Sequence, residues 1–123
     1  MSQNSLIIGN VSAPAARTAI NNAYDTLKTL HSGTSAPSAP APYMLWFDTT
    51  TSRLKIRDNS NADWVTIGYL DDANNDFHPV VGDWELTHSG TSLVFKYGST
   101  NRMKLDSSGN LTVTGDIIAF GTI

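Results

Sequence analysis

The chain has 123 residues and a formal net charge of −3, with no cysteine and no run of basic side chains. Binding to nucleic acid through phosphate neutralisation is therefore not expected, and neither disulfides nor a Cys/His zinc cluster can stabilise small apolar segments. We expect such segments to be stabilised by association between copies. The first residues have neither the basic nor the apolar pattern of a signal peptide or membrane span, so we expect synthesis in a cytoplasm and no membrane insertion.

Residues 1–11 are expected to form a docking arm ahead of the first regular element. Leu6, Ile7 and Ile8 make a short apolar run that Gly9 ends. An apolar arm before a helix has little of its own chain to lie on, so we expect this run to lie against a partner. A frayed terminus is the alternative.

Residues 12–33 contain the one predicted helix. Ser12 suits the N-cap, Pro14 is tolerated in the first turn, and Gly33 favours a helix end. Apolar residues recur at spacings of four and three, which is typical of a coiled-coil seam. The seam residues are Ala16, Ile20, Ala23, Leu27 and Leu30. Two heptads are short for a coiled coil, so an amphipathic helix packed on the chain's own β-domain is the alternative.

Residues 34–42 hold three prolines and no charge, which favours an extended, semi-rigid linker between helix and β-region. Residues 43–70 then contain three short apolar runs separated by small polar turn residues. In the second run Leu54 and Ile56 alternate with basic residues, as in a strand with one solvent face. We predict an antiparallel β-meander with the core residues Leu45, Trp46, Leu54, Ile56, Trp64 and Ile67.

Residues 71–82 are acidic and are expected to be a connector, and residues 83–123 are expected to be a second β-rich region. Alternating runs there are joined by four-residue turns, which again favours a meander. The end of this region, residues 117–123, is almost entirely apolar. Such a segment is more natural if a neighbouring subunit covers it.

The sequence offers no motif for catalysis or for a cofactor, so we do not expect an enzyme. Asp72, Asn74 and Asp76 alternate as at the start of a calcium loop, but Phe77 stands where that loop needs glycine, and a polar connector is the simpler interpretation. Aromatic side chains could form a platform for sugar rings, although burial at strand positions is more common. The candidates are Tyr43, Trp46, Trp64, Tyr69, Trp84 and Tyr97.

The sequence LWFDTTT after a proline-rich segment, followed by LKIR and WVTIG, resembles a segment of bacteriophage tail fibre and related virion proteins. The matching residues are Pro42, Leu45, Trp46, Asp48, Thr49, Thr50, Leu54, Lys55, Ile56, Arg57, Trp64 and Gly68. The stretch MKLDSSGNLTVTGDI, residues 103–117, is also similar to fibre sequence. The two stretches together cover rather more than a third of the chain.

This resemblance implies an elongated homotrimer that is mainly β, with short antiparallel β-meanders and N-terminal helices joined in a three-helix bundle. It implies a virion structural protein in a phage tail, whose arm and helix bind other tail or baseplate proteins and whose β-modules serve host adhesion. Two alternatives stay open. One is a small β-module that binds a host-surface polysaccharide, and the other is a capsid decoration or head-fibre protein.

Overall fold

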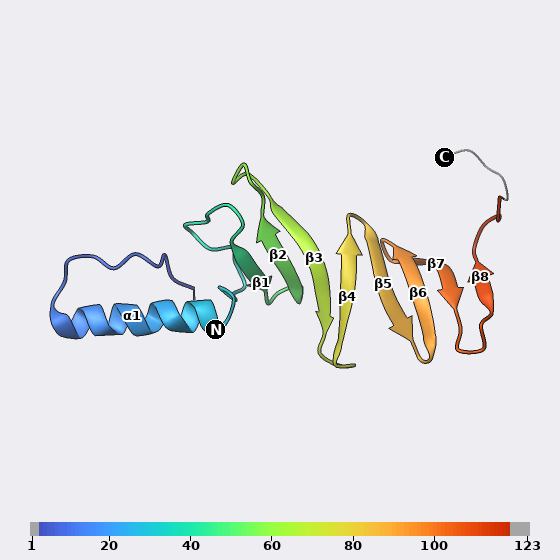
Figure 1. The fold of residues 1–123 in the computed structure, drawn as a ribbon, viewed down its shortest axis with the longest axis horizontal. Coiled ribbons are helices and arrows are strands. Elements are labelled where there is room, and N and C mark those ends of the chain that lie inside the picture. Colours follow the sequence, from blue (N-terminus) through green and yellow to red (C-terminus); the bar gives the residue numbers. More distant parts are fainter. Residues whose placement is uncertain (1–2, 119–123) are drawn as a thin grey trace.

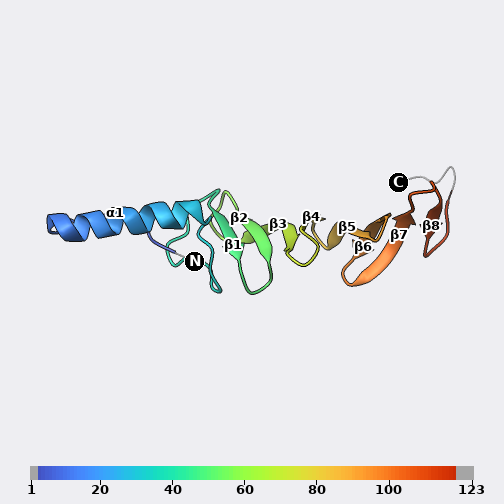
Figure 2. The same ribbon diagram turned by 90° about the horizontal axis from the view of Figure 1, so that it is seen from below.

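The structure, a computed structural model, describes residues 3–118, which form one helix followed by one antiparallel sheet of eight strands. Helix α1 (Ala13–Lys28) points along the long axis of the molecule, and the strands lie across that axis (Figure 1). The edge-on view shows the sheet as a single twisted layer (Figure 2). No helix within residues 3–118 is long and apolar enough to cross a membrane.

Each strand pairs with the next one in the chain, so the sheet order repeats the sequence order. This arrangement confirms the predicted class, mainly β with antiparallel meanders and one N-terminal helix. The strands are β1 (Leu45–Asp48), β2 (Arg53–Arg57), β3 (Trp64–Asp71), β4 (Asp76–Val81), β5 (Trp84–Ser89), β6 (Ser92–Tyr97), β7 (Thr100–Leu105) and β8 (Leu111–Val113).

Residues 71–82 were expected to be a connector, but in the structure they contain β4. This strand pairs with β3 and β5 and so joins the two expected meanders into one sheet. The turn before β4 is held by Asp71, whose carboxylate accepts hydrogen bonds from the backbone of Ala73 and Asn74. Asn75 completes the turn with a left-handed φ of 51°, a conformation that asparagine tolerates well. The acidic residues thus form a tight turn between strands, and Pro79 is accommodated opposite Gly68.

The helix ends at Lys28 rather than near Gly33, and the chain then makes direct hydrogen bonds to β1. Gly33 pairs in parallel with Asp48, and its N–H donates to the Phe47 carbonyl at 3.1 Å. The Thr49 N–H donates in turn to the Gly33 carbonyl at 3.1 Å. Residues 34–42 therefore leave and return as a loop beside β1, and they do not hold the helix away from the sheet as an extended spacer would (Figure 1).

The N-terminal arm runs back beside α1 after a polar anchor at its start (Figure 1). The amide Nε2 of Gln3 donates to the carbonyls of His31 at 3.0 Å and Ser35 at 2.7 Å. The apolar run that follows stays exposed, with Leu6, Ile7 and Ile8 at 37%, 77% and 44% of their full accessibility. The arm therefore has its own chain to lie on, yet its apolar side chains are uncovered.

A conventional hydrophobic core is absent from residues 3–118, where Trp46 and Val94 are the only buried large apolar side chains. The chain exposes 8551 Å², whereas a compact monomer of this mass exposes about 6,450 Å². The excess of roughly 2,100 Å² follows from the single-layer sheet and the projecting helix.

Candidate functional site

The candidate functional surface is one apolar face of the sheet. Residues paired across neighbouring antiparallel strands point to the same side, so the register assigns each side chain to a face. Apart from His88 and Thr100, the side chains on one face are apolar from β1 to β8, and we call it the apolar face. It consists of Leu45, Phe47, Leu54, Ile56, Val65, Gly68, Leu70, Phe77, Pro79, Val81, Trp84, Leu86, His88, Leu93, Phe95, Tyr97, Thr100, Met103, Leu105, Leu111 and Val113.

Large side chains of the apolar face are exposed to solvent in the single chain. Val81 retains 75% of its accessibility, Leu111 54% and Trp84 48%. Trp84 packs edge-on against Tyr97, with ring centroids 5.3 Å apart, and both rings stay exposed. Soluble monomers rarely expose a continuous apolar surface of more than a few hundred Å², and larger ones mark interaction sites.

The opposite face carries charged side chains, and we call it the polar face, although the register also places on it Trp46, Trp64, Tyr69, Val80 and Val94. Its β2 side chains stack on aromatic rings. Arg53 lies over Tyr69 at 5.7 Å, and Lys55 lies over Trp46 at 4.6 Å. Arg57 lies over Trp64 at 5.3 Å. These cation–π contacts fix the long basic side chains against the sheet, which explains why the basic strand of the LKIR segment lies beside two tryptophans.

Asp48 anchors the turn of the LWFDTTT segment. Its buried carboxylate accepts hydrogen bonds from Lys55 Nζ at 2.7 Å, from Thr51 Oγ1 at 2.8 Å and from the Thr50 N–H at 3.0 Å. Burial alone would raise the pKa of Asp48, but the bonds from Lys55, Thr51 and Thr50 outweigh it and the pKa is lowered. The D-T-T-T sequence is therefore a structural turn whose carboxylate is held ionised.

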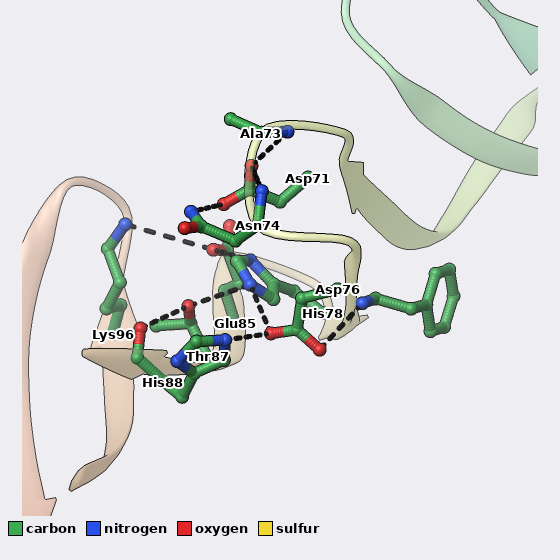
Figure 3. Close-up of polar contacts among 10 residues, drawn as sticks. Asp71, Ala73, Asn74, Asp76, His78, Glu85, Thr87, His88 and Lys96 are labelled. Carbon is green, nitrogen blue, oxygen red and sulfur yellow. Dashed lines mark hydrogen bonds and ion pairs between the residues drawn. The ribbon is translucent and has the colours of Figure 1, made fainter. Parts of the chain in front are cut away.

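A second group of polar side chains fills the space where β4 and β5 diverge (Figure 3). His78 is only 5% exposed, and its Nδ1 lies 3.0 Å from Glu85 Oε1. Its Nε2 lies 3.0 Å from both Asp76 Oδ2 and Thr87 Oγ1. The same Asp76 oxygen lies 3.0 Å from His88 Nε2. We call these five residues the polar junction.

The sequence did not predict the polar junction, because its members come from different strands and meet only through the register. The one available signal was the alternation of His78 with Phe77 and Pro79. The residues of the possible calcium loop are also separated here, since Asn74 donates to Asp71 while Asp76 contacts the two histidines. Among residues 3–118, no group of three or more His, Cys, Asp or Glu side chains is placed to hold a metal ion.

The predicted helix seam is largely uncovered. Ile20 and Leu27 keep 39% and 53% of their accessibility, while Ala16 and Ala23 are half-buried. Leu30 lies beyond the helix with a φ of 52° and is 41% exposed. No strand of the described chain packs against α1, so the alternative of an amphipathic helix lying on its own β-domain is not what the structure contains.

The predicted β-module core is divided between the two faces. Trp46 is buried and Trp64 half-buried, in edge contact at 5.2 Å on the polar face. Leu54 lies on the apolar face and is half-buried, as are Leu45 and Ile56. Ile67 lies at the bulge between β2 and β3 and is 37% exposed. These residues therefore line two surfaces and do not form one cluster. Of the expected apolar end, residues 119–123 lie outside the described residues.

No family model matches the chain, and no curated protein or solved structure that was compared with it is similar.

Proposed function

We propose that this chain is the subunit of a homotrimeric virion fibre, in which three copies turn their apolar faces toward a common axis. The continuous apolar face, which crosses all eight strands and is left uncovered by the chain itself, carries this proposal. A sheet with one apolar face needs a second layer to cover it. Within residues 3–118 no element covers this face, since α1 projects away from the sheet (Figure 1), and we take the second layer to be further copies.

The direction of the strands suits a fibre. The strands lie across the long axis, and neighbouring strands are about 4.8 Å apart, so eight of them extend roughly 34 Å along the axis. Three such sheets around one axis would enclose a single elongated core. The excess of roughly 2,100 Å² per chain is comparable with what obligate assemblies bury between subunits.

The helix supports the same arrangement from its own sequence pattern. Ile20 and Leu27 lie on one exposed stripe of α1, and α1 continues the direction of the sheet (Figure 2). Three helices on the same axis would bury this seam in a short bundle. The arm beside α1, with exposed Ile7, would then stand at the end of the fibre, where it could bind a tail or baseplate protein.

The resemblance to tail fibre sequences supports a phage virion as the location of the assembly, with the polar face outward and a role in host adhesion. A capsid decoration or head-fibre protein has the same physical requirements and differs in what the arm binds.

Glycan binding is favoured by one observation. A cleft of about 270 Å³ lies next to the half-exposed Trp84 and is lined by Arg53, Thr66, Asp83 and Glu85, which offer hydrogen bonds to hydroxyl groups.

Light scattering behind a sizing column, combined with the hydrodynamic radius, tests the fibre proposal. We expect about three times the chain mass of 13.3 kDa and a radius too large for a sphere of that mass. A compact monomer would contradict the proposal. Adding host-cell polysaccharide while recording tryptophan fluorescence tests the glycan alternative, and unchanged emission would count against it.

A further inference from the structure

The junction between β4 and β5 is the place where the backbone pairing of the sheet is weakest. These strands share two register pairs, Val80 with Glu85 and Val81 with Trp84. By contrast, β3 and β4 share four pairs and β5 and β6 share six. Beyond Val80 the strands separate (Figure 1), and the polar junction fills the opening (Figure 3). Side chains therefore carry much of the connection between β1–β4 and β5–β8.

His78 is placed so that protonation strengthens this connection. Its two ring nitrogens face carboxylate oxygens of Glu85 and Asp76, each at 3.0 Å. An ionised carboxylate only accepts hydrogen bonds, and an imidazole donates from both nitrogens only when it is protonated. In the neutral ring the Thr87 hydroxyl can donate to Nε2 at 3.0 Å, but Asp76 then faces a nitrogen that cannot donate to it.

Charged groups on the neighbouring strands surround His78. From β4 and β5, Asp76 and Glu85 contact the ring, and the His88 ring lies 6.4 Å from it. From β3, the Tyr69 ring lies 5.4 Å away and Asp71 is close enough to interact with the histidine charge. Two cations complete the surroundings through Glu85, namely Lys96 on β6 at 3.8 Å and Arg53 on β2 at 4.0 Å. With neutral histidines the three carboxylates outnumber these two cations, and protonation of both histidines reverses the imbalance.

We propose that the polar junction is a pH-dependent latch between the two halves of the sheet, closed when His78 and His88 are protonated and loosened when they are neutral. Charge-assisted hydrogen bonds are roughly twice as strong as neutral ones. Histidines change charge between about pH 5 and about pH 8, so the latch strengthens as pH falls through this range.

Amide hydrogen exchange of the whole protein, measured by NMR at about pH 5.5 and about pH 8, tests the latch. Protection factors, which remove the intrinsic effect of pH, are compared for the β4–β5 pairs and the β1–β2 pairs. We expect about tenfold greater protection at low pH for β4–β5 alone, which corresponds to about 1.4 kcal/mol. Ring ¹⁵N shifts should show His78 protonated where protection is high. Equal changes in both strand pairs, or no change, would overturn the proposal.

The variant His78→Gln keeps an amide donor but cannot carry the charge, so it should abolish the pH dependence of β4–β5 protection. His31→Gln is the matched control, because His31 is also buried but lies at the end of α1, and burial lowers its pKa. The control should keep the pH dependence. A His78→Gln protein with unchanged pH dependence would overturn the latch. If that variant does not fold, the wild-type ring shifts and protection factors decide the question alone.

Discussion

The ring of Phe77 on β4 lies directly over Gly68 on β3, so closely that a Cβ added to Gly68 would stand 1.9 Å from Phe77 Cζ. Gly68 is buried although it has no side chain, because the ring covers its backbone on the apolar face. The glycine that ends the WVTIG segment is thus required by the approach of an aromatic ring. This contact joins β3 of the first meander to β4, the strand that the sequence analysis did not predict.

Replacing Gly68 with alanine should therefore destabilise the protein by forcing the Phe77 ring off the sheet. Overpacking of this kind costs about 1–3 kcal/mol. Urea unfolding at a fixed protein concentration measures the loss, and Gly115→Ala is the control because nothing lies within 4 Å of its added Cβ. Equal unfolding midpoints for the two variants would show that Phe77 moves without cost.

A charge placed on the apolar face should have little effect on the stability of a monomer but should strongly destabilise the proposed trimer. Val81 is 75% exposed in one chain, so Val81→Asp should change the stability of a monomer by no more than about 0.5 kcal/mol. In the proposed trimer the new carboxylate would be buried without a partner, at a cost of about 3 kcal/mol or more. Thermal unfolding and light scattering measure both effects.

Thr112→Asp is the control for this substitution, since Thr112 is exposed and the register places it on the polar face of β8. It introduces the same charge and should leave mass and stability near those of the wild type. Similar behaviour of the two variants would argue against burial of the apolar face.

Substitution of the helix seam should dissociate the proposed bundle. The double variant Ile20→Asp and Leu27→Asp places two carboxylates on the exposed stripe of α1, where three helices would bring six of them together. We expect the mass to fall below that of a trimer, or the helix signal to weaken. Asn21→Asp, on the same helix but off the seam, should leave the mass unchanged. A trimeric mass for the double variant would show that α1 is not needed to hold the proposed trimer together.

The lowered pKa of Asp48 should make the free energy of unfolding decrease at acid pH. Because the folded-state pKa lies below the usual value, the ionised carboxylate stabilises the fold above about pH 4, and this contribution is lost as the pH falls through the folded-state value. Asp48→Asn removes the bond to Lys55 and should cost about 1–3 kcal/mol at pH 7.

Urea midpoints measured from neutral pH down to about pH 3 would show this dependence. The Asp48→Asn protein should lose less stability over that range than the wild type. Asp63→Asn is the matched control, since its side chain is exposed and holds no turn. Parallel pH curves for wild type and Asp48→Asn would contradict the role of the carboxylate.

Local alternation was enough to predict most of the strands, but not β4, which joins the two meanders into one sheet. Leu54 and Ile56 alternate with three basic residues, and that pattern identified β2 from sequence alone. Strand β4 was concealed because Pro79 and the preceding acidic turn are typical of connectors, and only its pairing with β3 reveals it. The end of α1 was misplaced because Gly33 was interpreted as a helix end, whereas it extends the edge of the sheet.

The candidate sites differ in how far the sequence could predict them. The exposed seam of α1 follows from spacing along one helix, so its residues were identifiable, although what they contact is not a local property. His78 and Glu85 meet across two strands whose register is set by the turn at Gly82, so their contact depends on pairing that no residue pattern specifies. The apolar face was divided among short runs and became continuous only when all seven pairings were known.

The strands follow one another in the sheet in the same order as in the chain, so the sheet is a linear series of hairpins. Because each strand contacts only its immediate neighbours in the sequence, inserting or deleting one two-stranded hairpin leaves every other contact intact. Each hairpin changes the length by about 9.6 Å and preserves which residues face the axis. Duplication of hairpins would therefore lengthen the proposed fibre without redesign of either end.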